Sequence, residues 1–166
     1  MTKTKKIALC AVLIALALAL SYIERFLPLQ LLIPLPGVKL GLANIVTLIA
    51  LYLLGGKSAF AILIPRCILG AVFGGGITGL MFSLTGGLLA MSVMALSRKA
   101  PLFSIYGVSV LGAAAYSVGQ ILAAMVLMHS VYVGAYLPYL LGVSIFTGLA
   151  TGTAGAGVLR VLRNRV

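Results

Sequence analysis

Nine of the twelve Lys and Arg residues of this chain gather at four places, and long apolar stretches separate these places. Short cytoplasmic loops of membrane proteins carry an excess of Lys and Arg. If all four places are cytoplasmic, the chain crosses the bilayer six times and has both ends inside. The residues at the four places are Lys3, Lys5 and Lys6, then Lys57, then Arg98 and Lys99, and finally Arg160, Arg163 and Arg165.

The composition points to the same class of protein. Hydrophobic residues make up 63% of the sequence and charged residues only 8%, and the mean hydropathy is +1.25. Such a chain cannot surround its core with a wet surface. We therefore expect an all-α integral membrane protein of six transmembrane helices, with residues 1–166 in a single domain. The high pI does not indicate a nucleic-acid partner, because the basic residues would face the anionic cytoplasmic leaflet.

The apolar stretches set the expected helix boundaries. A span needs about 20 apolar residues to cross a hydrocarbon layer of about 30 Å. Pro28, Pro34 and Pro36 exclude one continuous helix between the first two spans, so this segment is expected to be an outer loop. The six expected spans are 5–26, 38–54, 58–73, 77–97, 103–128 and 138–162.

The first expected span carries a stripe of small residues. Ala11, Ala15 and Ala19 recur every four residues and therefore share one face of a helix. A smooth face of this kind lets a second helix approach closely, and close packing drives helix association in lipid. Two interpretations remain open from the spacing alone. The stripe packs inside the bundle, or it docks a separate membrane protein.

A few polar residues interrupt the apolar spans, and they are the candidate binding site. Arg66 is the most costly of them, because a guanidinium within the bilayer needs a counter-charge or a polar cavity. In the six-span topology all of them fall in the outer half of the membrane. Convergent polar groups in an apolar bundle predict a small-molecule pocket that opens to the outside. The predicted pocket residues are Lys39, Asn44, Arg66, Tyr116 and Gln120.

Two roles for Arg66 follow from its chemistry. Its planar fork of N–H groups suits a carboxylate or a phosphate, so it is a candidate for recognising an anionic ligand. Alternatively it forms a salt bridge with Glu24, the only carboxylate side chain of the sequence. Lys39 lies nearer to the outer surface, where a lysine can also extend to the interface.

The sequence argues against an enzyme. It contains one acidic residue and no Asp, so it cannot build an Asp-bound magnesium diphosphate site, a two-metal centre or a pair of catalytic carboxylates. The segment 55–58 ends like a nucleotide-binding loop but lacks the first glycine at the required spacing. We expect no metal, no cofactor and no catalytic residue.

Four segments resemble one known family. They are PGVKLGLAN at 36–44, LYLLG at 51–55, FSLTGG at 82–87 and GVSVLGA at 107–113. They resemble the Gx transporter family, which is also called heptaprenyl diphosphate synthase component I, and the likeness covers nearly the whole chain. The chain departs from the family at Tyr116 and Ser117, where the family often has His-Asn.

The resemblance implies a function. This family is similar to the substrate-binding S components of energy-coupling factor (ECF) transporters, which are six-helix proteins of the bacterial plasma membrane that bind vitamins or their precursors from outside. In those proteins an alanine face on the first helix contacts a transmembrane coupling subunit, which works with ATPase subunits. The resemblance thus favours docking as the role of Ala11, Ala15 and Ala19.

Two functions of different classes are consistent with the sequence. The first is an S component that captures a small anionic vitamin or cofactor precursor. The second is a non-catalytic accessory subunit of isoprenoid or quinone synthesis. Co-purification distinguishes them, because the first predicts a coupling protein with ATPases and the second a soluble prenyltransferase.

Overall fold

The computed structural model describes residues 3–24, 26, 39 and 41–163, and every regular element within them is helical. The all-α class is therefore confirmed for this part of the chain. Two short elements, the π-helical η2 (Ala71–Gly75) and the 3₁₀ helix η3 (Val131–Tyr136), accompany the α-helices. The α-helices are α1 (Lys3–Glu24), α2 (Asn44–Leu54), α3 (Gly56–Gly70), α4 (Gly76–Ser97), α5 (Ile105–Met128) and α6 (Leu137–Arg163).

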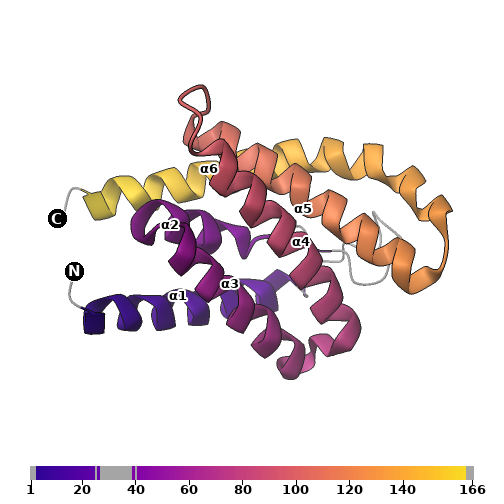
Figure 1. Ribbon diagram of the computed structural model, residues 1–166, viewed down its shortest axis with the longest axis horizontal. Coiled ribbons are helices and arrows are strands. Elements are labelled where there is room, and N and C mark those ends of the chain that lie inside the picture. Colours follow the sequence, from indigo (N-terminus) through magenta and orange to yellow (C-terminus); the bar gives the residue numbers. More distant parts are fainter. Residues whose placement is uncertain (1–2, 25, 27–38, 40, 164–166) are drawn as a thin grey trace.

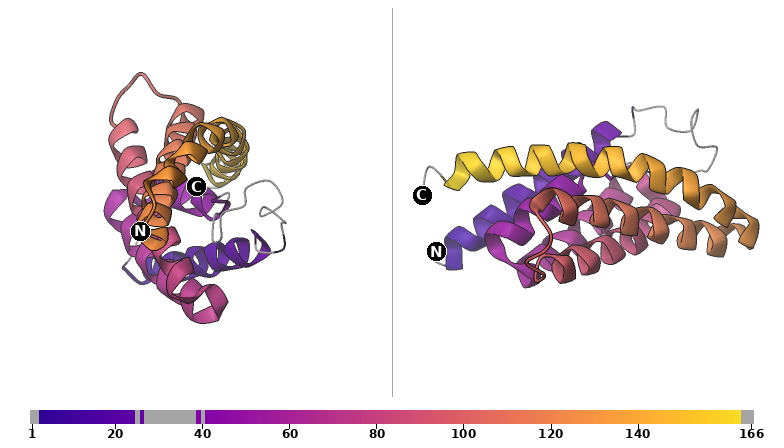
Figure 2. Two further views of the ribbon diagram at one scale, coloured as in Figure 1. Left: turned by 90° about the vertical axis from the view of Figure 1, so that its right-hand side faces the viewer. Right: turned by 90° about the horizontal axis from the view of Figure 1, so that it is seen from above.

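The helices form one bundle with an uneven division of contacts (Figure 1). α5 packs along α4 on one side and along α6 on the other, and these are the most extensive contacts among the described elements. α1 packs on α2 and α3 at the edge of the bundle. The start of α1 and the end of α6 lie at the same end of the bundle, as Figures 1 and 2 both show.

Four described helical stretches are long and apolar enough to cross a membrane, namely 3–24, 56–97, 105–128 and 131–162. The second of these contains both α3 and α4. The chain changes direction between them at η2, where Gly74 has φ +104° and the following Gly76 has φ +60°. Both values lie in a region that favours glycine. α3 itself ends at Gly70, a few residues before the expected end of the third span at residue 73.

The second expected span differs from the observed helix. The sequence predicts a span over 38–54, whereas α2 begins at Asn44 and has 11 residues. At 1.5 Å per residue such a helix is only about 16 Å long, so it cannot cross a hydrocarbon layer by itself. Residues 38 and 40 lie outside the described residues. Gly41 takes φ +83° just before α2, which is incompatible with a helix that runs continuously through this point.

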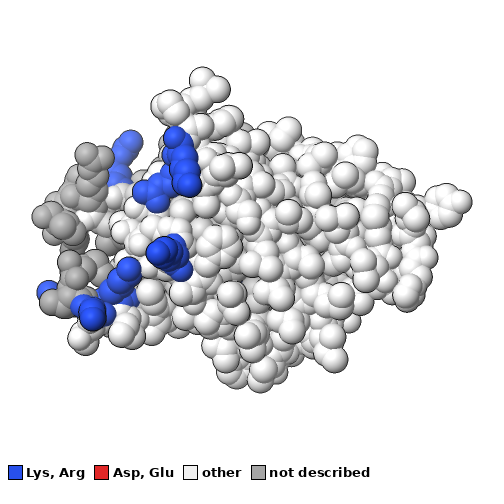
Figure 3. Space-filling view, in the orientation of Figure 1, with Lys and Arg blue, Asp and Glu red and all other residues white. Residues whose placement is uncertain are grey.

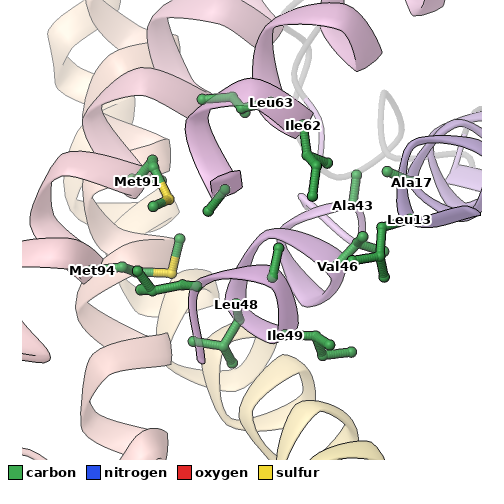
Figure 4. Packing of buried hydrophobic residues seen from close by; sticks show 14 of the residues in the cluster. Leu13, Ala17, Ala43, Val46, Leu48, Ile49, Ile62, Leu63, Met91 and Met94 are labelled. Carbon is green, nitrogen blue, oxygen red and sulfur yellow. The ribbon is translucent and has the colours of Figure 1, made fainter. Parts of the chain in front are cut away.

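α2 is short but forms the centre of the hydrophobic core. From Val46 to Leu51 every residue is buried. Figure 4 shows Val46, Leu48 and Ile49 of α2 close to core residues of its neighbours. Those neighbours contribute Leu13 and Ala17 from α1, Ile62 and Leu63 from α3, and Met91 and Met94 from α4.

The contact between α5 and α6 depends on small residues. A Cβ atom added at Gly148 would lie 2.6 Å from the Cα atom of Val110, so the two helix backbones approach as closely as glycine allows. Nearby, Ser109 Oγ and Thr151 Oγ1 share a hydrogen bond of 2.7 Å between the two helices. Small residues and interhelical hydroxyl bonds are typical of helix packing in membranes.

The exposed basic side chains of the described residues gather at one end of the molecule. In Figure 3 the Lys and Arg atoms on the visible face lie at the end where α1 begins and α6 ends, and the rest of that face carries none. The side chains at the start of α1, between α2 and α3, after α4 and near the end of α6 are exposed. They are Lys3, Lys5, Lys6, Lys57, Arg98, Lys99 and Arg160.

Candidate functional site

A small polar cavity lies among three long helices, α3, α4 and α5. The last turn of α1 and the residues that precede α2 complete its walls. Its volume of about 20 Å³ is enough for about one water molecule. Among the described residues, three that line it carry a formal charge, namely Glu24, Lys39 and Arg66. The other lining residues are Ser21, Gly41, Ala43, Cys67, Gly70, Ser83 and Tyr116.

Lys39 and Glu24 are held by contacts with distant parts of the chain. Lys39 Nζ donates a hydrogen bond of 2.8 Å to Ser83 Oγ on α4. The backbone N–H of Gly41 donates a bond of 2.6 Å to Glu24 Oε1 at the end of α1. Gly41 makes this turn with φ +83°, and a Cβ atom there would lie 2.8 Å from the side-chain Nδ2 atom of Asn44. Glycine at position 41 therefore lets the chain bring Lys39 and Glu24 to one cavity.

Arg66 is buried and only partly satisfied. Its side chain is 7% exposed, and its Nη2 atom donates a hydrogen bond of 3.2 Å to Asn44 Oδ1. Its Nε atom is buried without a hydrogen-bond partner among the residues that the structure describes. A buried N–H of a cation without an acceptor is costly. Arg66 therefore lines the cavity and still has an N–H group that can donate a hydrogen bond to a ligand.

Tyr116 lies in the wall of the same cavity and is 4% exposed. Its ring fits between two glycines, because a Cβ atom added at Gly41 or Gly86 would lie 3.2 Å or 2.9 Å from a ring carbon. Gln120 lies one turn further along α5, is fully buried, and does not line the cavity. Neither atom of its side-chain amide has a hydrogen-bond partner within the described ranges.

The structure therefore brings together most of the predicted pocket residues. Lys39, Arg66 and Tyr116 line the cavity, and Asn44 is bonded to Arg66. Gln120 lies one turn from Tyr116 on α5 but does not line the cavity.

Sequence reasoning missed Ser83 and Cys67 as lining residues. Ser83 belongs to the FSLTGG segment, so the family motif carried a signal for it. Cys67 is buried, and its Sγ atom lies 3.5 Å from the carbonyl oxygen of Ser83, to which it donates.

An apolar groove of about 370 Å³ adjoins the polar cavity. Ser21 and Gly70 line both of them, so the two spaces are neighbours along the junction of α1 and α3. The remaining groove residues come from α1 and from η2, and they are Leu18, Ala19, Tyr22 and Phe73.

The alanine stripe of α1 points away from the core. Ala11, Ala15 and Ala19 are all exposed, whereas Leu13 and Ala17 on the opposite side of the helix are buried. Within the described part of the chain, the alanine stripe therefore does not pack inside the bundle. Its role in docking stays a prediction.

Within the described ranges, no three histidine, cysteine or carboxylate side chains lie close enough together to hold a metal ion.

Comparison with known proteins gives one family. The family model described as heptaprenyl diphosphate synthase component I matches residues 13–158. No curated protein and no solved structure matches the chain. The matched range includes the groups around the polar cavity and most of the bundle. Since it spans most of the sequence, the chain belongs to the heptaprenyl diphosphate synthase component I family.

Proposed function

We propose that this protein is the substrate-binding component of an ECF-type transporter in the bacterial plasma membrane. It takes up a small anionic vitamin or cofactor precursor from the outside and docks on a coupling subunit through α1. It is a binding protein and not an enzyme. The observation that carries this proposal is a buried guanidinium in the wall of a polar cavity, whose Nε atom has no hydrogen-bond partner among the described residues. Ionisable groups at such positions commonly mark substrate pathways in membrane proteins.

The distribution of charge supports a six-span topology with cytoplasmic termini, in which the short α2 and the segment before it together form the second span. Exposed basic residues occupy the end of the bundle where α1 begins and α6 ends (Figure 3). Glu24, which lines the cavity, is the last residue of the 22-residue helix α1, about 30 Å along the helix from its basic start. In this topology the cavity lies in the outer half of the membrane, where an external substrate arrives.

The small volume of the cavity fits an occluded state of a binding protein. A space of about 20 Å³ is far below the 300–1,000 Å³ that is usual for ligand pockets. Substrate entry thus requires the walls to move apart. The segment before α2 forms part of those walls through Lys39 and Gly41, and it holds α1 and α4 together through two hydrogen bonds.

The uncovered alanine face supports docking through α1. This helix packs on α2 and α3 only, among the described elements, and leaves Ala11, Ala15 and Ala19 exposed. A coupling subunit that packs against this face would approach closely, because alanine adds almost no volume to the helix surface.

Co-purification tests the proposed function. The protein is expressed with its host's coupling subunit and ATPase subunits, and an affinity tag on this chain recovers the complex. Ala15→Leu should abolish recovery of the coupling subunit and leave the fold intact. Ala154→Leu is the matched control, because Ala154 is equally exposed but lies on α6, and it should recover the complex normally. Recovery of the complex with Ala15→Leu would remove α1 as the docking helix.

The family description supports a second candidate. The words "component I" of heptaprenyl diphosphate synthase suggest an accessory subunit of prenyl synthesis. The same tagged preparation distinguishes the two, since a soluble prenyltransferase recovered in place of the coupling and ATPase subunits would favour the accessory role.

A further inference from the structure

We infer that the ligand of this site is a monoanionic amphiphile, whose single negative charge binds in the polar cavity and whose apolar body lies in the adjoining groove between α1 and α3. This inference rests on the proposed binding function and names the chemical class of the ligand.

The two spaces form one composite site. Ser21 of α1 and Gly70 of α3 line both the cavity and the groove. Gly70 leaves space at this junction, because a Cβ atom there would meet only Leu18, at 3.8 Å, among the described residues. A ligand whose head is in the cavity can therefore extend past Ser21 and Gly70 into the groove without crossing a wall of bulky side chains.

The charges that line the cavity favour a head with one negative charge. Lys39 and Arg66 contribute two positive charges and Glu24 one negative charge, so the described lining has a net charge of one positive. A monoanion neutralises this set in a low-dielectric site, whereas a diphosphate leaves uncompensated negative charge, which is costly to bury.

Arg66 supplies the donor for this head. Its Nη2 atom is bonded to Asn44, and its buried Nε atom has no acceptor in the described part of the chain. A carboxylate oxygen is the acceptor that completes the guanidinium's hydrogen bonding. Lys39 adds a second positive charge, held in place by Ser83.

The groove fits an apolar body of moderate size. Its volume of about 370 Å³ has room for roughly a dozen water-sized groups of about 30 Å³ each. Leu18, Tyr22 and Phe73 give it an aliphatic and aromatic lining. Close packing of an apolar chain on these side chains provides dispersion contacts that a free head group lacks.

A series of probes with one body and different heads tests the inference. Farnesoic acid, farnesol and farnesyl diphosphate are titrated by calorimetry into the full chain in phosphatidylcholine nanodiscs, with empty nanodiscs as the blank and acetate as the head alone. Farnesoic acid should bind at least about tenfold more tightly than each of the others. Tighter binding of farnesyl diphosphate would overturn the monoanionic head. Binding of acetate as tight as that of farnesoic acid would overturn the role of the groove.

Two variants locate the probe. Arg66→Gln should lower the affinity for farnesoic acid by roughly ten- to a hundredfold, the effect of losing a hydrogen bond to a charged group. Gly70→Leu should block the groove and lower this affinity by a similar factor. Gly142→Leu is the control, because Gly142 lies on α6 in open space, and it should not change the affinity. Unchanged affinity in both Arg66→Gln and Gly70→Leu would overturn the site.

Competition separates a dedicated ligand from membrane lipid, whose phosphodiester head also carries one negative charge. Phosphatidylglycerol added to the nanodiscs should not displace farnesoic acid, and equal competition would assign the groove to bilayer lipid and overturn the inference. These titrations need no partner protein. If the co-purification fails, the titrations still test the ligand class. If the complex is recovered but the titrations fail, only the ligand class is rejected.

Discussion

Lys39 donates a hydrogen bond of 2.8 Å to the hydroxyl of Ser83, and this contact joins two segments that are 44 positions apart in the sequence. One segment leads into α2 and contains Gly41, which donates to Glu24, and Asn44, the first residue of α2, which accepts from Arg66. The other is in α4. The two family motifs PGVKLGLAN and FSLTGG thus meet at the polar cavity. This arrangement explains why residues so distant in the chain form one site.

Removing the hydroxyl at position 83 should loosen this junction. Ser83→Ala leaves Lys39 without one of its contacts, so we expect the free energy of unfolding to fall by about 0.5–1.5 kcal/mol, the usual net worth of one hydrogen bond. Unfolding in mixed micelles measures the change. Ser92→Ala, an exposed position on the same helix, serves as the control and should be neutral. Equal effects of both variants would show that the Lys39 contact contributes nothing specific.

The packing of α5 on α6 predicts a larger effect at Gly148. A methyl group at this position would meet the backbone of Val110 at 2.6 Å, and a backbone atom cannot rotate out of the way. Gly148→Ala should therefore destabilise the bundle by about 1–3 kcal/mol, the cost of overpacking. Gly157→Ala on the same helix has open space and should unfold like the wild type or later. Thermal unfolding of the purified variants compares the two.

Sequence periodicity predicted the long helices well, because their apolar residues and the glycine run at 74–76 act locally. It failed at α2, where it predicted a span from residue 38. The observed start at Asn44 depends on Gly41, whose turn is fixed by Glu24 and by the ring of Tyr116. Such contacts are tertiary, so no local pattern reports them.

The candidate site was partly predictable for a similar reason. Arg66, Lys39 and Asn44 stand out in apolar stretches because a charge or an amide is rare there. Ser83 and Cys67 do not stand out by residue type, since small polar residues are common in membrane helices. The FSLTGG segment marks Ser83 as part of a family motif, but the fold is needed to show that both residues line the cavity. The exposure of the alanine stripe also could not be known before the partners of α1 were seen.

The topology predicts where single cysteines react with a membrane-impermeant thiol reagent. In a background with Cys10→Ala and Cys67→Ser, Lys57→Cys and Lys99→Cys should react only from the cytoplasmic side. Tyr132→Cys should react from outside, because Tyr132 is 91% exposed in η3 at the other end of α5. Labelling of intact cells against inverted vesicles makes the comparison. Reaction of Lys57→Cys in intact cells would reverse the proposed orientation.

Substitutions of Arg66 should show whether ligand binding needs only its positive charge or also the planar shape of its guanidinium. Arg66→Lys keeps the positive charge but loses the planar fork and the bond geometry to Asn44. We expect the binding free energy of farnesoic acid to weaken by about 1.5–3 kcal/mol, the range for hydrogen bonds to charged groups. Arg66→Gln should weaken it at least as much. Calorimetry in nanodiscs measures both.

A double variant decides whether Arg66 binds ligand or only balances Glu24. Glu24→Gln keeps the side-chain oxygen that accepts from the Gly41 N–H, so the turn before α2 should persist while the negative charge is lost. If Arg66 only neutralises Glu24, then Glu24→Gln combined with Arg66→Gln removes both charges together and binds farnesoic acid like the wild type. If Arg66 contacts the anionic head, the double variant stays weak, because the guanidinium donor is missing in it as well. We expect the second result. Wild-type affinity in the double variant would assign Arg66 a structural role instead.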